Sequence, residues 1–112
     1  MIRIKRNASV DGCGKEILLA LVTKIHPAFE AENVDTWITS GTEHYKHSVK
    51  RSAHYRGDAL DLRSKHLFPK RAKYKVYNTL KRRLGEDFVV ILEAEGRPWE
   101  HFHIHWSPIH KE

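Results

Sequence analysis

The chain has 112 residues, of which 40% are hydrophobic and 30% charged, and it carries a formal net charge of +6 at pH 7. This length and composition exclude fibrous, repetitive and disordered chains, and we expect residues 1–112 to form a single globular domain with one core. The longest apolar run, residues 17–22, is too short to cross a bilayer, and no secretory signal is recognisable.

The positive charge is clustered rather than evenly spread. Basic residues concentrate in segments 46–56, 63–75 and 81–83. Such clusters favour an anionic partner, with nucleic acid and the bacterial cell wall both open, although solubilising helix surfaces explain the same pattern about equally well. A single cysteine, Cys13, excludes an internal disulfide and a thiolate cluster, so nitrogen and oxygen atoms would have to hold any metal.

The first half of the chain predicts two strands around one helix. Residues 1–6 alternate apolar and basic side chains, which indicates a short strand at a sheet edge. Apolar residues then recur at helical spacing over 15–31, and Pro27 should kink this helix rather than end it, because Phe29 continues its apolar face. Residues 34–40 have a β-rich composition closed by Gly41 and indicate a core strand.

A long loop over residues 42–56 follows, rich in histidine, tyrosine and basic residues, and it should lie over a surface or cleft. Residues 59–62 resume strand character, with Asp61 facing away from the core. Beyond Pro69, apolar residues repeat every fourth position until Gly85, which predicts a second, strongly basic helix.

The last third of the chain predicts an antiparallel hairpin. The apolar run 88–93 indicates a central strand, a turn containing Gly96 follows, and residues 101–106 alternate histidine with apolar side chains. Together the elements predict an α+β fold, with a small antiparallel sheet of about four strands and two main helices.

Histidines and carboxylates suggest a metal site. His54 and Asp61 flank a glycine-marked turn, and the final strand would present His101, His103 and His105 on one face. Zinc hydrolases hold the ion with three nitrogen or oxygen ligands and keep one position for water, so His54, Asp61 and one of these histidines would suffice. A lone histidine is more often structural, but this combination favours a mononuclear zinc hydrolase.

Two motifs resemble those of the zinc D-alanyl-D-alanine carboxypeptidase and dipeptidase family. They are Ser52-x-His54-x-x-Gly57-x-Ala59-x-Asp61 and Glu100-x-x-His103, and the likeness extends over about residues 37–108. The family includes phage endolysins that cut between L-alanine and D-glutamate, and it shares its fold with murein endopeptidases and the hedgehog signalling domain. The resemblance therefore implies a hedgehog/DD-peptidase-like fold, a Zn²⁺ cofactor and hydrolysis of a peptidoglycan stem peptide.

Carried over by position, the resemblance implies His54, Asp61 and His103 as the zinc ligands. The Glu-x-x-His spacing from Glu100 selects His103 among the histidines of the final strand. As the general base the resemblance implies Glu100 first, with Glu93 at the end of the preceding strand as the alternative. His101 would bind substrate or stabilise a transition-state oxyanion. For His105 we expect a structural role, or a role in which it contacts a ligand residue without binding the metal itself.

The loop and its flanks supply the expected substrate contacts. His47 matches the loop histidine that follows a Thr-Ser-Gly strand end, and Arg56 belongs to the basic loop that would hold substrate carboxylates. Ser52 would bind a substrate carboxylate or cap a turn, with equal weight. We expect a monomer without a membrane segment, made in the cytoplasm without a signal peptide. It would act on the cell wall after release as a phage or prophage lysis protein, or be virion-associated.

Two other functions remain open from the sequence. A non-catalytic zinc-binding interaction domain would keep the ligands, but the carboxylates of Glu93 and Glu100 argue against it. A metal-dependent nuclease or nucleic-acid-binding protein would use the basic helices, but no nuclease motif is recognisable.

Overall fold

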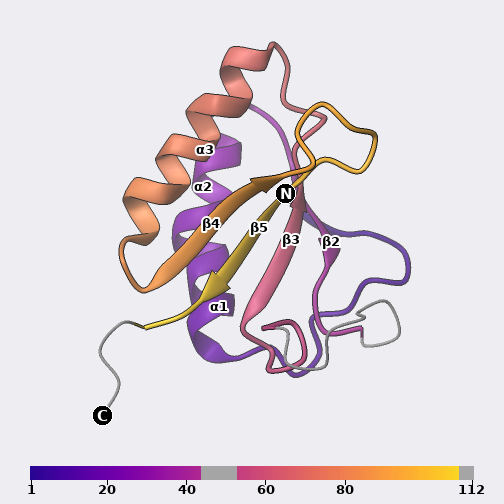
Figure 1. Ribbon diagram of the computed structural model, residues 1–112, viewed down its shortest axis with the longest axis vertical. Coiled ribbons are helices and arrows are strands. Elements are labelled where there is room, and N and C mark those ends of the chain that lie inside the picture. The colour runs from indigo at the N-terminus through magenta and orange to yellow at the C-terminus, as the bar shows by residue number, and fades with distance from the viewer. Residues whose placement is uncertain (44–52, 109–112) are drawn as a thin grey trace.

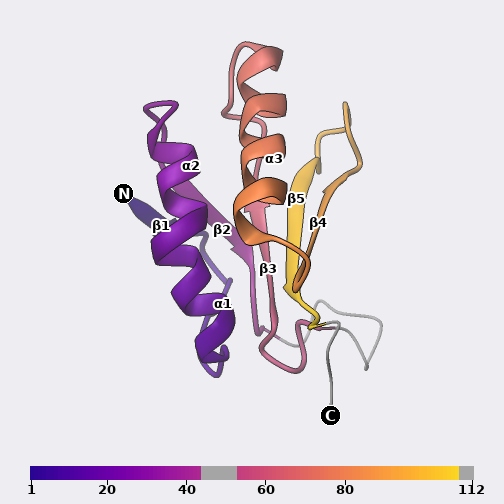
Figure 2. The ribbon, with the colours of Figure 1, turned by 90° about the vertical axis from the view of Figure 1, so that its left-hand side faces the viewer.

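A computed structural model describes residues 1–43 and 53–108. The predicted substrate contacts His47 and Ser52 lie outside the described residues. Five strands form one sheet in the order β1-β2-β3-β5-β4, and the helices pack on one of its faces (Figures 1 and 2). The elements are β1 (Ile2–Ile4), α1 (Lys15–Ala20), η1 (Leu21–Ile25), α2 (His26–Glu30), β2 (Thr36–Ser40), β3 (Ala59–Arg63), α3 (Lys70–Leu84), β4 (Phe88–Glu93) and β5 (His101–Trp106).

The first helical segment continues through Pro27, as predicted. It runs as α1, a wider π-helical turn η1, and α2, without an intervening loop. Proline cannot donate a backbone hydrogen bond to the preceding turn, and the π-helical turn directly before it accommodates that loss. Phe29, beyond the proline, is completely buried, so the apolar face does extend past the irregularity.

The alternation of side chains in β3 and β5 divides the sheet into a core face and an open face. Leu60 and Leu62 of β3, with Phe102 and Ile104 of β5, have 0% exposure and join the helices in the core. The residues between them point the opposite way because strand side chains alternate. The prediction that Asp61 faces away from the core is therefore confirmed.

The expected sheet was wrong in three respects. The observed sheet has five strands instead of about four. It is also mixed and not purely antiparallel, because β1 pairs parallel to β2 while the remaining pairs are antiparallel. In addition, β4 lies at an edge and not in the centre. Its apolar run is only partly covered, and Ile91 is 41% exposed, so a continuous apolar run did not signal burial on both faces.

Other expectations are confirmed. The first strand is at a sheet edge, β4 and β5 form an antiparallel hairpin, and α3 ends where Gly85 adopts a φ of 76°. Within residues 1–43 and 53–108, none of the helices has the length and apolar character needed to cross a membrane. The α+β class holds.

Candidate metal centre

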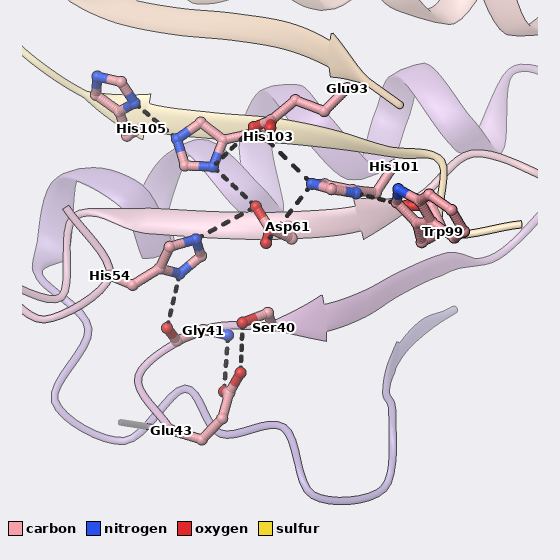
Figure 3. Close-up of polar contacts among 10 residues, drawn as sticks. All are labelled: Ser40, Gly41, Glu43, His54, Asp61, Glu93, Trp99, His101, His103 and His105. Carbon is pink, nitrogen blue, oxygen red and sulfur yellow. Dashed lines mark hydrogen bonds and ion pairs between the residues drawn. The ribbon is translucent and has the colours of Figure 1, made fainter. Parts of the chain in front are cut away.

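Three side chains converge on the open face of the sheet (Figure 3). His54 comes from the turn before β3, Asp61 from β3, and His103 from β5, and their potential ligand atoms all lie within 4.8 Å of one another. Asp61 and His103 are direct partners in the β3–β5 register. The sheet therefore sets the positions of two of the groups, and the chain turn before β3 brings in the third.

Asp61 lies at the centre of this cluster. Its Oδ1 is 2.8 Å from Nδ1 of His103 and 3.3 Å from Nε2 of His54. Burial raises the pKa of Asp61, but the hydrogen bonds from the two histidines lower it more, and the net pKa falls well below its usual range. The carboxylate is therefore charged at neutral pH.

His54 is held by a backbone carbonyl. Its side chain is almost fully buried, and its Nδ1–H donates to the carbonyl oxygen of Gly41 at 2.8 Å. That bond orients the ring and directs Nε2 at Asp61. Burial lowers the pKa of His54, but the contacts with Asp61, the Gly41 carbonyl and the charge of Glu43 together raise it more, so the net pKa is above its ordinary value. The cluster thus favours a positive charge at this point.

Glu43 anchors the segment that presents the Gly41 carbonyl. Its carboxylate accepts hydrogen bonds from the backbone N–H of Gly41 at 2.8 Å, from that of Ser9 at 2.9 Å, and from the Ser40 hydroxyl. Burial raises the pKa of Glu43, but these donors lower it more, and the net pKa is below normal. A charged, fully engaged carboxylate therefore fixes the end of β2 beneath His54.

His105 stands behind His103 on the same strand face. Its Nδ1 is 2.8 Å from Nε2 of His103, while Nδ1 of His103 points at Asp61. Burial lowers the pKa of His105, and the neighbouring His103, Arg56 and His54 lower it further, which favours the neutral ring. Where a metal takes the place of the Nδ1 proton that His103 donates to Asp61, a neutral His105 can accept the Nε2–H of His103, so that Nδ1 can serve as the ligand atom. This contact agrees with the role expected for His105.

The two candidate bases lie on opposite faces of the sheet. The Glu93 side chain on β4 is 44% exposed, with Oε1 3.9 Å from Nδ1 of His103. The side chain of Glu100 is only 4% exposed; its Oε1 binds Nζ of Lys73 at 2.9 Å and the N–H of Gly96 at 3.0 Å, and its Oε2 accepts from Ser64.

This placement argues against Glu100 as the general base, a role that stays a prediction. An odd separation along an extended chain sends two side chains to opposite faces, so Glu100 points towards α3 while His103 points to the cluster. Its carboxylate is already paired with an ammonium group. Of the two candidates, the geometry favours Glu93.

His101 occupies the rim between the cluster and Glu93. Its Nδ1–H donates to the carbonyl oxygen of Trp99 at 2.8 Å, and its Nε2 lies 3.9 Å both from Oδ2 of Asp61 and from Oε1 of Glu93. The ring is therefore oriented with Nε2 directed towards both carboxylates, where a group of a bound substrate would be within reach.

The turn between the first two ligands depends on glycine. Gly57 has a φ of 76°, and a Cβ atom there would lie 2.3 Å from the carbonyl oxygen of Gly12. No other residue type fits both conditions without movement of the backbone. Arg56 beside it is exposed, with Nε 3.2 Å from Oδ2 of Asp58. Arg56 lies near the cluster, since its positive charge helps to lower the pKa of His105.

A pocket of about 420 Å³ adjoins the cluster. It is lined by Lys5, Trp37, Thr39, Asp61, Arg63, Lys65, Pro98, Trp99, Glu100 and His101. Sequence reasoning did not select Trp37, Trp99 or the three cations, and it also missed Glu43. The period-two spacing of Asp61 and Arg63 was a usable signal for one of them, since it places both on one strand face.

The donor atoms of the cluster suit a divalent cation. Two imidazoles and one carboxylate are available, with a carbonyl behind one ring and a neutral histidine behind the other. Such supporting partners are what metal-binding histidines require. The cluster could therefore hold a metal ion. Comparison with protein-family models, curated proteins and solved structures gave no match to this chain.

Proposed function

We propose that this protein is a zinc-dependent peptidase that hydrolyses a peptide bond in the peptidoglycan stem peptide. The observation that carries the proposal is the convergence of His54 Nε2, Asp61 Oδ1 and His103 Nδ1. Three nitrogen and oxygen ligands, with the fourth position left for water, are typical of catalytic zinc. The resemblance of the ligand motifs to the D-alanyl-D-alanine carboxypeptidase and endolysin family supports the choice of reaction.

Zinc, when bound, would supply a Lewis acid and lower the pKa of a coordinated water towards neutrality. The chain's contribution is to hold the ligand atoms facing one another. The Gly41 carbonyl orients His54, and His105 orients His103. Both rings are thereby fixed before a metal or substrate arrives, which is what catalytic geometry requires.

Glu93 is the proposed general base. Its carboxylate lies beside the cluster, is 44% exposed, and has no ammonium partner among the residues that the structure describes. It can take a proton from the attacking water and later give that proton to the departing amine. Glu100 cannot do this without breaking its bonds to Lys73 and Ser64, and its role in the proposal is structural.

His101 would contact the scissile group. Its Nδ1–H is committed to the Trp99 carbonyl, so Nε2 is the atom left for substrate. An N–H at Nε2, which lies 3.9 Å from the carboxylates of Asp61 and Glu93, would donate to the negative charge that develops on the carbonyl oxygen of the substrate.

The stem peptide is the proposed substrate because the motifs resemble those of wall peptidases and because the site is bordered by cations. Either a D-Ala-D-Ala bond or an L-Ala-D-Glu bond fits the proposal. The expected setting is lysis by a phage or prophage, or a virion-associated enzyme.

The test is mass spectrometry of purified muropeptides incubated with the protein, with and without a chelator. Product masses identify the bond, and chelation should abolish cleavage, with recovery on addition of zinc. Zinc content is measured in parallel by elemental analysis. His54→Ala and Asp61→Ala should lose both metal and activity, whereas Arg82→Gln, on the exposed surface of α3, should lose neither.

Two outcomes would replace the proposal. Zinc bound at one equivalent without hydrolysis of any muropeptide would indicate a non-catalytic zinc domain. Salt-sensitive binding and cleavage of DNA would indicate a nuclease that uses the basic α3 surface.

A further inference from the structure

The pocket beside the cluster has a chemical character of its own. Its wall includes two indole rings, Trp37 from β2 and Trp99 from the turn before β5, and three cations, Lys5, Arg63 and Lys65. The arrangement combines flat apolar surfaces with clustered positive charge. Such a lining suits a ligand that carries a carboxylate on a short apolar stem.

The three cations are not neutralised by acids. Within residues 1–43 and 53–108, none of them is in an ion pair with a carboxylate. Lys65 donates to the carbonyl oxygen of Pro98, which orients its ammonium group and leaves its charge unmatched. The Arg63 guanidinium lies over the Trp37 ring, 5.9 Å from the centroid, which also keeps its charge.

Two acidic residues also line the pocket, but their charges are already matched. Asp61 is held by the histidines of the cluster, and the carboxylate of Glu100 is bound by Lys73 on the helix side. The pocket therefore presents a net positive lining to a ligand.

The position of the pocket relates it to the cleaved bond. Arg63 follows Asp61 by two residues on the same face of β3, and two strand residues span about 7 Å. An extended substrate advances by a similar distance in two residues. A carboxylate at Arg63 would therefore lie one or two residues along the substrate from a bond held at the cluster.

We propose that this pocket is an acid-binding subsite that selects a peptide with a free carboxylate one or two residues from the cleaved bond, with Arg63 and Lys65 as its principal partners. The inference rests on the proposed peptidase function and specifies the substrate class of the same site. In a stem peptide, the α-carboxylate of the glutamate is such a group.

The test uses a matched pair of probes, a stem peptide whose glutamate has a free α-carboxylate and the same peptide with that carboxylate amidated. Binding to the full chain is followed by NMR in the presence of a chelator, so that no turnover occurs. The indole N–H signals of Trp37 and Trp99 should shift, and that of Trp106, which is not in the pocket lining, serves as the internal reference.

The free-acid peptide should bind about tenfold more tightly than the amide, since it alone forms charge-assisted hydrogen bonds. The double variant Arg63→Gln/Lys65→Gln should bind the free-acid peptide and the amide with affinities within about twofold of each other. Neither peptide can form the charge-assisted hydrogen bonds once the two cations are gone. The control Arg82→Gln/Arg83→Gln, which removes the same charge from exposed positions on α3, should keep the full preference.

Equal binding of the two peptides by the unaltered chain, or a preference that survives in Arg63→Gln/Lys65→Gln, would overturn the subsite. These results are distinct from failure of the proposed function. If the protein prefers the free acid but the zinc-loaded protein hydrolyses no peptide, the acid-binding subsite is supported and the peptidase function is refuted. If it hydrolyses the peptide but shows no preference, the peptidase function is supported and the acid-binding subsite is refuted.

Discussion

Replacing Glu100 by glutamine separates a structural role from a catalytic one. The Glu100 carboxylate is 2.9 Å from the Lys73 ammonium group, and the two side chains are 4% and 11% exposed. Glutamine keeps the shape and can still accept from Gly96, but it leaves the Lys73 charge unmatched. Breaking a buried pair in this way costs about 3 kcal/mol, a large part of the roughly 5–15 kcal/mol that stabilises a domain.

Urea unfolding measures this loss directly, and a loss of about 3 kcal/mol corresponds to a fall in Tm of about 10 °C for a chain of this size. Zinc content and the turnover of the variant that remains folded should match the unaltered protein. Adding Lys73→Met should restore most of the stability, because no buried charge is then left alone. Unchanged stability together with abolished hydrolysis would refute the reasoning and return the base role to Glu100.

Three further predictions concern the site and its support. Glu93→Gln should lower turnover by about 10²–10⁴-fold while zinc content and Tm stay unchanged, as steady-state kinetics and elemental analysis would show; normal turnover would exclude Glu93 as the base. His105→Phe should weaken zinc binding by about 10–100-fold in a chelator competition, because His103 loses the partner that orients it; unchanged affinity would remove that role.

The third prediction concerns the pH dependence of stability. Burial raises the pKa of Glu100, but the Gly96 N–H, Lys73 and Ser64 lower it more. The net pKa of Glu100 in the folded chain is therefore below normal. Its stabilisation should be complete above the unfolded pKa of about 4.3 and be lost as pH falls through the folded value, so the stability difference from Glu100→Gln should shrink over that window. A difference that stays constant down to pH 2 would contradict this.

Local patterns were sufficient to predict most of the elements. Spacing of apolar residues gave the long helix, with Pro27 inside it, and α3 up to Gly85. Alternation gave the open and core faces of β5. These features depend on side-chain periodicity, which can be recognised from neighbouring residues without knowledge of tertiary contacts. The pairing of β1 with β2 is different, because parallel or antiparallel partnership is decided by contacts between distant segments, and the chain carries no local signal for it.

The choice between the two carboxylates shows where motif spacing fails. Glu100 fits the Glu-x-x-His spacing. However, the chain before His103 is extended, and this conformation places the Glu100 side chain on the face of the sheet that α3 covers. Its capture by Lys73 joins positions 27 residues apart, which periodicity within one element cannot reveal. The same applies to Glu43, whose role depends on the approach of Ser9 across 34 residues. Charged groups with several distant partners are therefore the least predictable parts of this site.

The partnership of Asp61 and His103 has a consequence for folding. These residues are 42 positions apart and meet only through the register of β3 with β5. A slip by one residue would send one of the two side chains to the opposite face and dismantle the donor set. The fraction of chains that bind metal during refolding would therefore report the fraction in which β3 and β5 have paired in the native register. It would distinguish these chains from collapsed chains of similar size.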